Sequence, residues 1–162
     1  MNNDKIRWMK MAIKEAEKAY KKGEVPVGAV AVMNGKIVAK AHNSPISLKD
    51  PTAHAEVLVM RKAGKKIGNY RLENLTIYTT LEPCIMCYGA MVNSRIKKLV
   101  FGADDPKGGF RIFLANEKRL NHKIKIESGI LAEECSEILK RFFNERRGTE
   151  VVITGPTRNR LS

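Results

Sequence analysis

Apolar and polar positions follow two different spacings along this chain, and the changes of spacing predict its first elements. Before Gly23, apolar side chains recur at helical intervals with Lys and Glu between them, which predicts an amphipathic helix ending near Gly23. The apolar face of this helix comprises Ile6, Met9, Ile13, Ala16 and Tyr20. Two mostly apolar runs at 27–33 and 36–42 flank Asn34-Gly35, a pair typical of a tight β-hairpin.

Beyond a polar loop at 43–52, helical and strand patterns alternate. In chain order the pattern predicts a helix opening at His54, a strand at 75–80, a helix at 84–94, strands at 98–102 and 123–127, and a C-terminal helix whose apolar positions run from 131 to 143. Residues 104–121 fit neither spacing. Strands that alternate with helices predict an α/β fold, namely a three-layer α/β/α sandwich around a mixed five-stranded sheet.

Length and composition fit one globular domain. The chain has 162 residues, 43% of them hydrophobic, which is enough for a substantial core. We place this domain at 1–147 and a C-terminal tail, a candidate for disorder, at 148–162. No apolar run typical of a signal peptide follows the first residues, and no segment approaches the roughly 20 apolar residues of a membrane span. We therefore expect a cytoplasmic protein.

Charge and cysteine content narrow the function. The 30 Lys and Arg against 17 Asp and Glu give a net charge of +13, which favours binding to polyanions, nucleic acid first. A Lys-rich surface like that of thermophile proteins is the alternative explanation. The pair Cys84 and Cys87 forms a C-x-x-C, and with only Cys135 besides, the cysteines make a poor disulfide framework. They indicate a metal or redox site in a reducing compartment, with Cys135 in the core.

The candidate chemistry lies in two short segments, Ala53-His54-Ala55-Glu56 and Pro83-Cys84-Ile85-Met86-Cys87. Two thiols three residues apart in a helical turn face the same side and can hold one ion, with His54 as the third ligand. A zinc ion with three protein ligands keeps its fourth position for water, as hydrolysis requires. Pro83 suits the first turn of a helix, whose dipole favours thiolates.

Glu56 follows His54 by two residues, so on a helix their side chains diverge by roughly 200° and do not bind the same ion. Near the start of the helix Glu56 can instead reach the water and carry protons from it to the reacting base and the departing amine. The combination H-x-E … P-C-x-x-C is the signature of zinc-dependent nucleobase deaminases. A C-x-x-C alone also occurs in redox and structural zinc sites, but a thioredoxin-type site would leave His54 and Glu56 without a role.

A longer set of segments resembles the bacterial tRNA adenosine deaminases of the TadA type. These segments are Glu24-Val25-Pro26-Val27-Gly28-Ala29-Val30, Asn43-Ser44-Pro45, Asp50-Pro51-Thr52-Ala53-His54-Ala55-Glu56, Thr80-Leu81-Glu82-Pro83-Cys84-Ile85-Met86-Cys87, Ser94-Arg95-Ile96, Phe101-Gly102-Ala103 and Asn121-His122. The resemblance implies a cytidine deaminase-like fold, a homodimer with one zinc ion per subunit, and conversion of the wobble adenosine of a tRNA anticodon stem-loop to inosine.

The resemblance also assigns roles to single residues. It makes His54, Cys84 and Cys87 the zinc ligands, and it makes Glu56 the catalytic proton shuttle. The residues that it places at the substrate are Asn43 against the base, Val27 in the wall of the base pocket, Glu82 with its carbonyl near the leaving amine, Asp105 and Lys107 beside the anticodon loop, and Phe143, Arg146 and Arg147 on the last helix. Phe143 is equally suited to the core. Further candidates for phosphate contacts are Lys62, Lys65, Lys66, Lys118, Arg119 and Arg141.

One segment departs from this family. After Asp105-Pro106-Lys107-Gly108-Gly109 the resemblance leads us to expect small residues and a longer stretch before Asn121-His122, but Phe110-Arg111-Ile112-Phe113 follow. Two other functions therefore stay open. One is deamination of a free base or nucleoside such as guanine or cytosine, and the other is an RNA-binding protein that keeps zinc only for stability.

Overall fold

The computed structural model describes residues 2–114 and 120–154, with side chains for 3–114 and 120–147. Its elements in chain order are α1 (Asn2–Lys21), β1 (Gly28–Met33), β2 (Lys36–His42), α2 (Pro45–Leu48), α3 (Ala55–Ile67), β3 (Thr76–Leu81), α4 (Ile85–Ser94), β4 (Lys98–Ala103), the 3-10 helix η1 (Phe110–Ile112), β5 (Lys125–Ser128) and α5 (Ala132–Thr154). The predicted hairpin, helices and strands are all present, with bounds that shift by a few residues.

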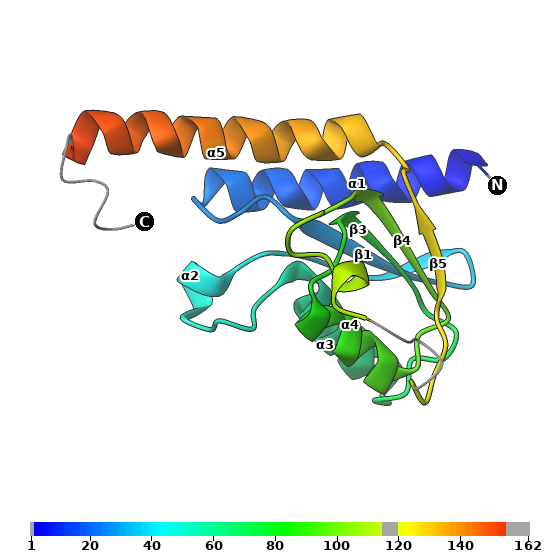
Figure 1. Cartoon of the computed structure of the whole chain (residues 1–162). Helices are drawn as coiled ribbons and strands as arrows, with labels where there is room; N and C mark the ends of the chain where they lie inside the picture. Colours follow the sequence, from blue (N-terminus) through cyan, green and yellow to red (C-terminus); the bar gives the residue numbers. More distant parts are fainter. Residues whose placement is uncertain (1, 115–119, 155–162) are drawn as a thin grey trace.

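The strands form one mixed sheet in the order β2-β1-β3-β4-β5. Strand β1 is antiparallel to β2 and β3, whereas β3, β4 and β5 run parallel. Positive φ angles of 53° at Asn34 and 74° at Gly35 form the tight turn of the hairpin. Helices α1 and α5 lie side by side on one face of the sheet, and α3 and α4 cover the other (Figure 1). The predicted three-layer α/β/α sandwich is confirmed.

Alternation along the strands builds a core on each side of the sheet. In β1, Ala29 and Ala31 pack with the α3 and α4 side, whereas Val30 and Val32 pack with α1 and α5. Because both faces are covered, β1 is apolar throughout, and the polar Thr79 and Thr80 of β3 are buried as well. The sheet is therefore a rigid support on which the first turns of α3 and α4 have fixed positions.

The buried face of α1 differs from the predicted one. Met9 and Ala16 are buried as predicted, but Ile6 is 36% exposed, and Ala12, which is outside the predicted face, is fully buried against the sheet. A Cβ atom at Gly28 of β1 would lie 1.9 Å from the carbonyl oxygen of Ala12. Helix and strand approach so closely that Ala and Gly, rather than larger apolar residues, occupy the contact.

Two local predictions were wrong. The loop predicted at 43–52 contains the short helix α2, and Pro83 lies before Cys84, the residue that caps α4, rather than inside the first turn. The predicted domain boundary at 147 stays a prediction; helix α5 spans this position and continues to Thr154. Parts of the predicted tail and of the 104–121 segment, namely 155–162 and 115–119, lie outside the described residues. Within the described part, none of the helices is long and apolar enough to cross a membrane.

The contact between α1 and β1 leads to a stability prediction. We expect Gly28→Ala to lower the free energy of unfolding by about 3 kcal/mol, because the new Cβ would collide with backbone atoms of Ala12 and Ala16. Gly89→Ala in α4 is the matched control, since its Cβ would meet no atom within 4 Å. That change should be neutral or stabilising by up to about 1 kcal/mol. Urea unfolding followed by circular dichroism measures both variants, and equal losses would contradict the expectation.

Candidate metal centre

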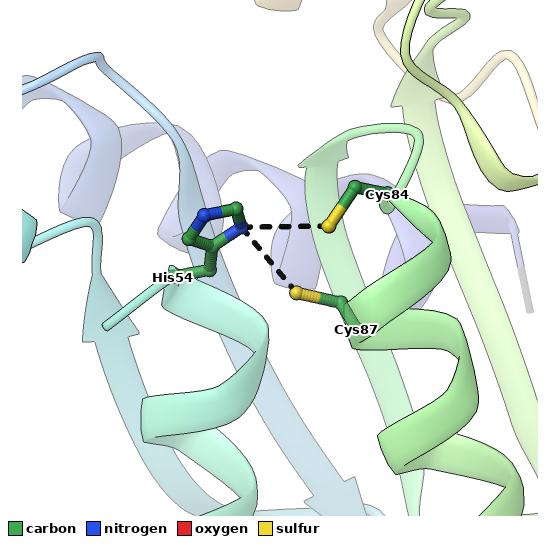
Figure 2. Close-up of side chains that lie close together, drawn as sticks. All are labelled: His54, Cys84 and Cys87. Atoms are coloured by element: carbon green, nitrogen blue, oxygen red, sulfur yellow. Dashed lines mark hydrogen bonds between the residues drawn. The ribbon is translucent and has the colours of Figure 1, made fainter. Parts of the chain in front are cut away.

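The two segments singled out in the sequence meet where α3 and α4 begin. His54 precedes α3 and Cys84 precedes α4, both with extended backbone, and Cys87 lies in the first turn of α4. Figure 2 shows the imidazole of His54 directed between the two sulfur atoms. Since the N-termini of both helices point to this spot, their dipoles favour negative charge on the two sulfurs.

The distances within this cluster suit a zinc ion. The Nδ1 atom of His54 lies 3.6 Å from the Sγ of Cys84 and 3.5 Å from the Sγ of Cys87, and all three ligand atoms lie within 4.8 Å of one another. Tetrahedral zinc, at about 2.3 Å from sulfur and 2.0 Å from nitrogen, requires a sulfur–nitrogen separation of about 3.5 Å. Both sulfur–nitrogen distances are therefore already those of a zinc tetrahedron.

The pKa values of the two thiols also favour the binding of a cation. The pKa of Cys84 is lowered to about 4, because its sulfur accepts hydrogen bonds from Cys87 and His54. The pKa of Cys87 is raised, because its thiol donates to Cys84 and is buried. The pair thus shares one proton, which zinc binding would release to give two thiolates.

Glu56 lies beside the cluster without belonging to it. Its side chain is only 4% exposed, and burial raises the pKa of its carboxyl to about 7. Its carboxyl also contacts the side chain of Cys87. A buried carboxyl next to a metal site can both accept and donate a proton near neutral pH, whereas an exposed one is a weak acid–base catalyst there.

Asn43 and Val27 are linked to the cluster by hydrogen bonds that involve backbone groups. The Oδ1 atom of Asn43 accepts a hydrogen bond of 2.8 Å from the N–H of Ala55, which lies between His54 and Glu56. The N–H of Asn43 in turn donates to the carbonyl of Val27 at 3.0 Å. Both side chains are buried, so the two residues predicted at the base lie directly beside the metal ligands.

The side chain of Glu82 makes structural contacts with the loop after β4. Its carboxylate is buried two residues before Cys84 and accepts hydrogen bonds from the N–H groups of Asp105 and Arg111 and from the Arg111 guanidinium. Burial alone would raise the pKa of this carboxyl, but these donors outweigh burial and lower the pKa. The side chain of Glu82 is therefore engaged with the 104–112 loop rather than with the metal ligands.

The predicted RNA contacts fall into two groups. Phe143 is 42% exposed and lines a cavity of about 180 Å³ together with Asn43 and Arg146. It is Phe142, beside the Tyr20 ring, that enters the core. The guanidinium of Arg147 contacts the side chain of Asn144, on the exposed side of α5. The structure thus places Phe143 and Asn43 on the lining of one cavity, of which Arg147 is not a part.

The lysines proposed for phosphate contacts lie farther away. Lys65 and Lys66 are in the last turn of α3, about 17 Å along the helix from His54. Lys107 is exposed on the loop after β4, at the same edge of the sheet as the cluster. Lys118 and Arg119 lie outside the described residues.

Two residues that hold the surroundings of the cluster were missed. Glu24 is 1% exposed and its carboxylate accepts hydrogen bonds from the N–H groups of Ile46 and Ser47, which fixes α2. Arg111 pairs with Glu82, as described above. No local pattern predicts either residue: Glu24 follows Lys21-Lys22-Gly23, where a charged side chain is expected to be exposed, and the partner of Arg111 is distant in the sequence.

The fold and the cluster together define the class of the protein as a zinc-dependent deaminase. The sequence model described as MafB19-like deaminase matches residues 3–147. The chain is 53% identical over 150 residues to the tRNA-specific adenosine deaminase of Bacillus subtilis (strain 168), covering 91% of this chain and 92% of that protein. The tRNA-specific adenosine deaminase of Aquifex aeolicus (strain VF5) is 49% identical, covering 86% and 94%. The chain belongs to the tRNA-specific adenosine deaminase family.

Solved structures agree with this placement. A structure described in a study of A-to-I editing by tRNA:A34 deaminases at the wobble position superposes with a TM-score of 0.78 at 40% identity, over 82% of this chain and 99% of that one. A guanine deaminase from Nitrosomonas europaea has a TM-score of 0.74 at 20% identity, over 85% and 83%. At that identity the second similarity concerns the fold alone.

The metal centre is tested by metal content. We expect the purified protein to hold one zinc ion per chain. The Cys87→Ala variant should hold less than about 0.2 zinc ions per chain, because its two remaining protein ligands bind zinc too weakly. Cys135→Ala is the matched control, since this buried cysteine packs against Gly102 on the other side of the sheet. Inductively coupled plasma mass spectrometry measures zinc in all three proteins. Loss of zinc from the Cys135 variant, or its retention by the Cys87 variant, would contradict the assignment.

Proposed function

We propose that this protein converts adenosine to inosine at the wobble position of a tRNA anticodon, using water and releasing ammonia. The observation that carries the proposal is that the three ligand residues lie next to the buried carboxyl of Glu56 and the amide of Asn43. Relatives that are named tRNA-specific adenosine deaminases support the choice of substrate.

In this mechanism the chain holds the base, moves protons and excludes water. A zinc ion held by His54, Cys84 and Cys87 would supply a Lewis acid that makes hydroxide available near neutral pH. Glu56 accepts a proton from the water that attacks C6 of the base, and delivers it to the ring. It then accepts the second proton, from the hydroxyl group now on C6, and delivers it to the amine, so that the C6–N bond breaks and ammonia leaves. Water adds one oxygen and two hydrogens, so adenosine and water give inosine and ammonia.

The base is positioned by residues whose backbones are already fixed. Because Oδ1 of Asn43 is engaged by Ala55, its amide nitrogen is the group that donates to the base. The buried Val27 supplies an apolar wall. Phe143 lies exposed beside this pocket, where an aromatic ring can stack on a neighbouring base of a splayed anticodon loop.

The outer contacts belong to charged residues. We assign Lys107 and Arg147 to phosphates of the anticodon stem-loop, and Asp105 to the loop that presents Lys107. The carbonyl of Glu82 faces the leaving amine in this proposal. The cytoplasmic location predicted from the sequence is consistent with a tRNA substrate and stays a prediction.

A homodimer is also part of the proposal. On the α3, α4 and η1 side, several apolar side chains are exposed, among them Tyr70 at 75%, Phe113 at 57% and Ile85 at 43%. A cavity of about 560 Å³ lies between α3 and α4 on this side. Apolar surface of this kind is typical of a protein interface, and a second copy of the chain would cover it.

Product analysis tests the substrate. We expect an anticodon stem-loop with adenosine at the wobble position to yield inosine, and a chelator to abolish it. The rate at low RNA concentration should fall steeply between about 50 and 200 mM salt, because phosphate contacts release counterions. Free adenosine, cytosine and guanine are the parallel arms. Turnover of a free base at rates above those of the stem-loop, with no dependence on salt, would favour the alternative deaminase.

The role of Glu56 is tested separately from the metal. We expect Glu56→Gln to keep zinc and fold while deamination falls by about a thousandfold, because the amide cannot carry the proton. Glu73→Gln, at an exposed residue paired with Arg71, is the control for loss of a carboxylate. Single-turnover inosine formation and zinc content are measured together. Full activity of the Glu56 variant would leave an RNA-binding protein with a structural zinc as the better account.

A further inference from the structure

The 104–112 loop is tied to the strand end that leads into the metal ligands. The carboxylate of Glu82 accepts hydrogen bonds from the N–H of Asp105 at 3.0 Å and from the N–H of Arg111 at 3.2 Å. The Arg111 guanidinium donates to Glu82 at 2.9 Å and, through the same nitrogen, to the carboxylate of Asp104 at 2.9 Å. The side chain of Arg111, at one end of the loop, thus links Asp104, at the other end, to the buried carboxylate of Glu82.

Close packing of the backbone reinforces this arrangement. A Cβ at Gly109 would lie 2.2 Å from the carboxylate carbon of Glu82, so the loop passes directly over that side chain. The N–H of Phe110 donates to the carbonyl of Pro83 at 2.8 Å, one residue before Cys84. The Phe110 ring stacks on Tyr88 of α4, with centroids 4.0 Å apart and planes 2° from parallel. In Figure 1, η1 lies beside the start of α4.

The contacts continue from Glu82 to Lys107. Asp105, held by Glu82 through its N–H, uses its own carboxylate to accept from the N–H groups of Lys107 at 3.3 Å and Gly108 at 3.0 Å. Lys107 is the exposed cation of this loop that the proposed function assigns to RNA. Its position relative to the metal ligands therefore depends on the contacts of Glu82.

We propose that Arg111 is a positioning residue that sets RNA affinity: by clamping the 104–112 loop to Glu82 and Asp104, it holds Lys107 where the anticodon loop binds. The inference rests on the proposed function and adds to it a residue at a position where the sequence departs from the TadA-type pattern. Arg111 takes no part in the chemistry, because its guanidinium is occupied by two carboxylates and the ring face of Phe101.

A simpler explanation is that Arg111 binds phosphate itself. Its side chain is 44% exposed, so charge alone would attract RNA. The matched control is Arg71→Ala, because Arg71 is 47% exposed and forms an ion pair of the same 2.9 Å length with Glu73. If loss of one positive charge were sufficient, both variants would weaken RNA binding equally.

The first test separates binding from chemistry. We expect Arg111→Ala to raise the KM for the anticodon stem-loop about tenfold with kcat at saturating RNA within about twofold, because one charge-assisted pair is lost and no reacting group moves. Arg111→Lys, which keeps the charge but not the paired contact, should recover part of the loss, and Arg71→Ala should change neither constant. A fall in kcat with an unchanged KM would overturn the proposal.

The second test asks whether Arg111 acts through Lys107. In a double-mutant cycle with Lys107→Ala, we expect the second substitution to add little to the KM, since a mispositioned lysine has no contact left to lose. Additive effects would instead mean that Arg111 contacts RNA directly, which would overturn the proposal.

A readout without substrate distinguishes this inference from the proposed function. In Arg111→Ala, amide hydrogens of Gly109 and Phe110 should exchange about tenfold faster, while those of β3 stay protected. Unchanged exchange would refute the clamp even if the protein makes inosine. Wild-type protein that makes no inosine would refute the proposed function, and with it the role of the clamp in RNA affinity.

Discussion

The convergence of two helix N-termini at one edge of the sheet is the constraint on which the site depends. His54 and Cys84 each stand immediately before a helix, so their positions follow from where α3 and α4 begin. Those starting points are fixed by the apolar packing of both helices on the sheet. The ligand spacing that suits zinc is therefore a result of packing in the whole domain, and the dipoles of the same two helices favour the thiolates.

Around this edge, buried polar side chains hold the loops by accepting hydrogen bonds from backbone N–H groups. Glu24 holds α2, Asn43 holds the first residue of α3, and Glu82 holds the loop after β4. Burying any of these polar side chains without hydrogen-bond partners would cost free energy. Each loop is therefore stabilised in the one conformation that supplies the partners. The loops around the ligand residues are thus held by specific hydrogen bonds, as the ligand residues are held by the helices.

The sequence predicted what depends on local spacing and missed what depends on distant partners. The five strands, the hairpin and the ligand residues were predicted, because periodicity and the H-x-E … P-C-x-x-C spacing are local properties. The exposed Ile6 was predicted inside, since hydrophobicity does not show that Ala12 and Gly28 meet. Nor could Phe110 and Arg111 be placed, because their partners Tyr88 and Glu82 lie more than twenty positions earlier.

The residues of the metal site and the residues assigned to RNA lie on different kinds of structural element. Residues that carry the chemistry are fixed by helices and sheet, whereas residues assigned to RNA sit on a loop and on the outer side of α5. A substitution at Gly109 would strike the carboxylate of Glu82, two residues from Cys84, and so would disturb the metal site. Beyond Arg111, Ile112 and Phe113 are exposed, and their side chains can vary without reaching that carboxylate. Substitutions at the far end of this loop would therefore leave the metal site unchanged, whereas those at its centre would not.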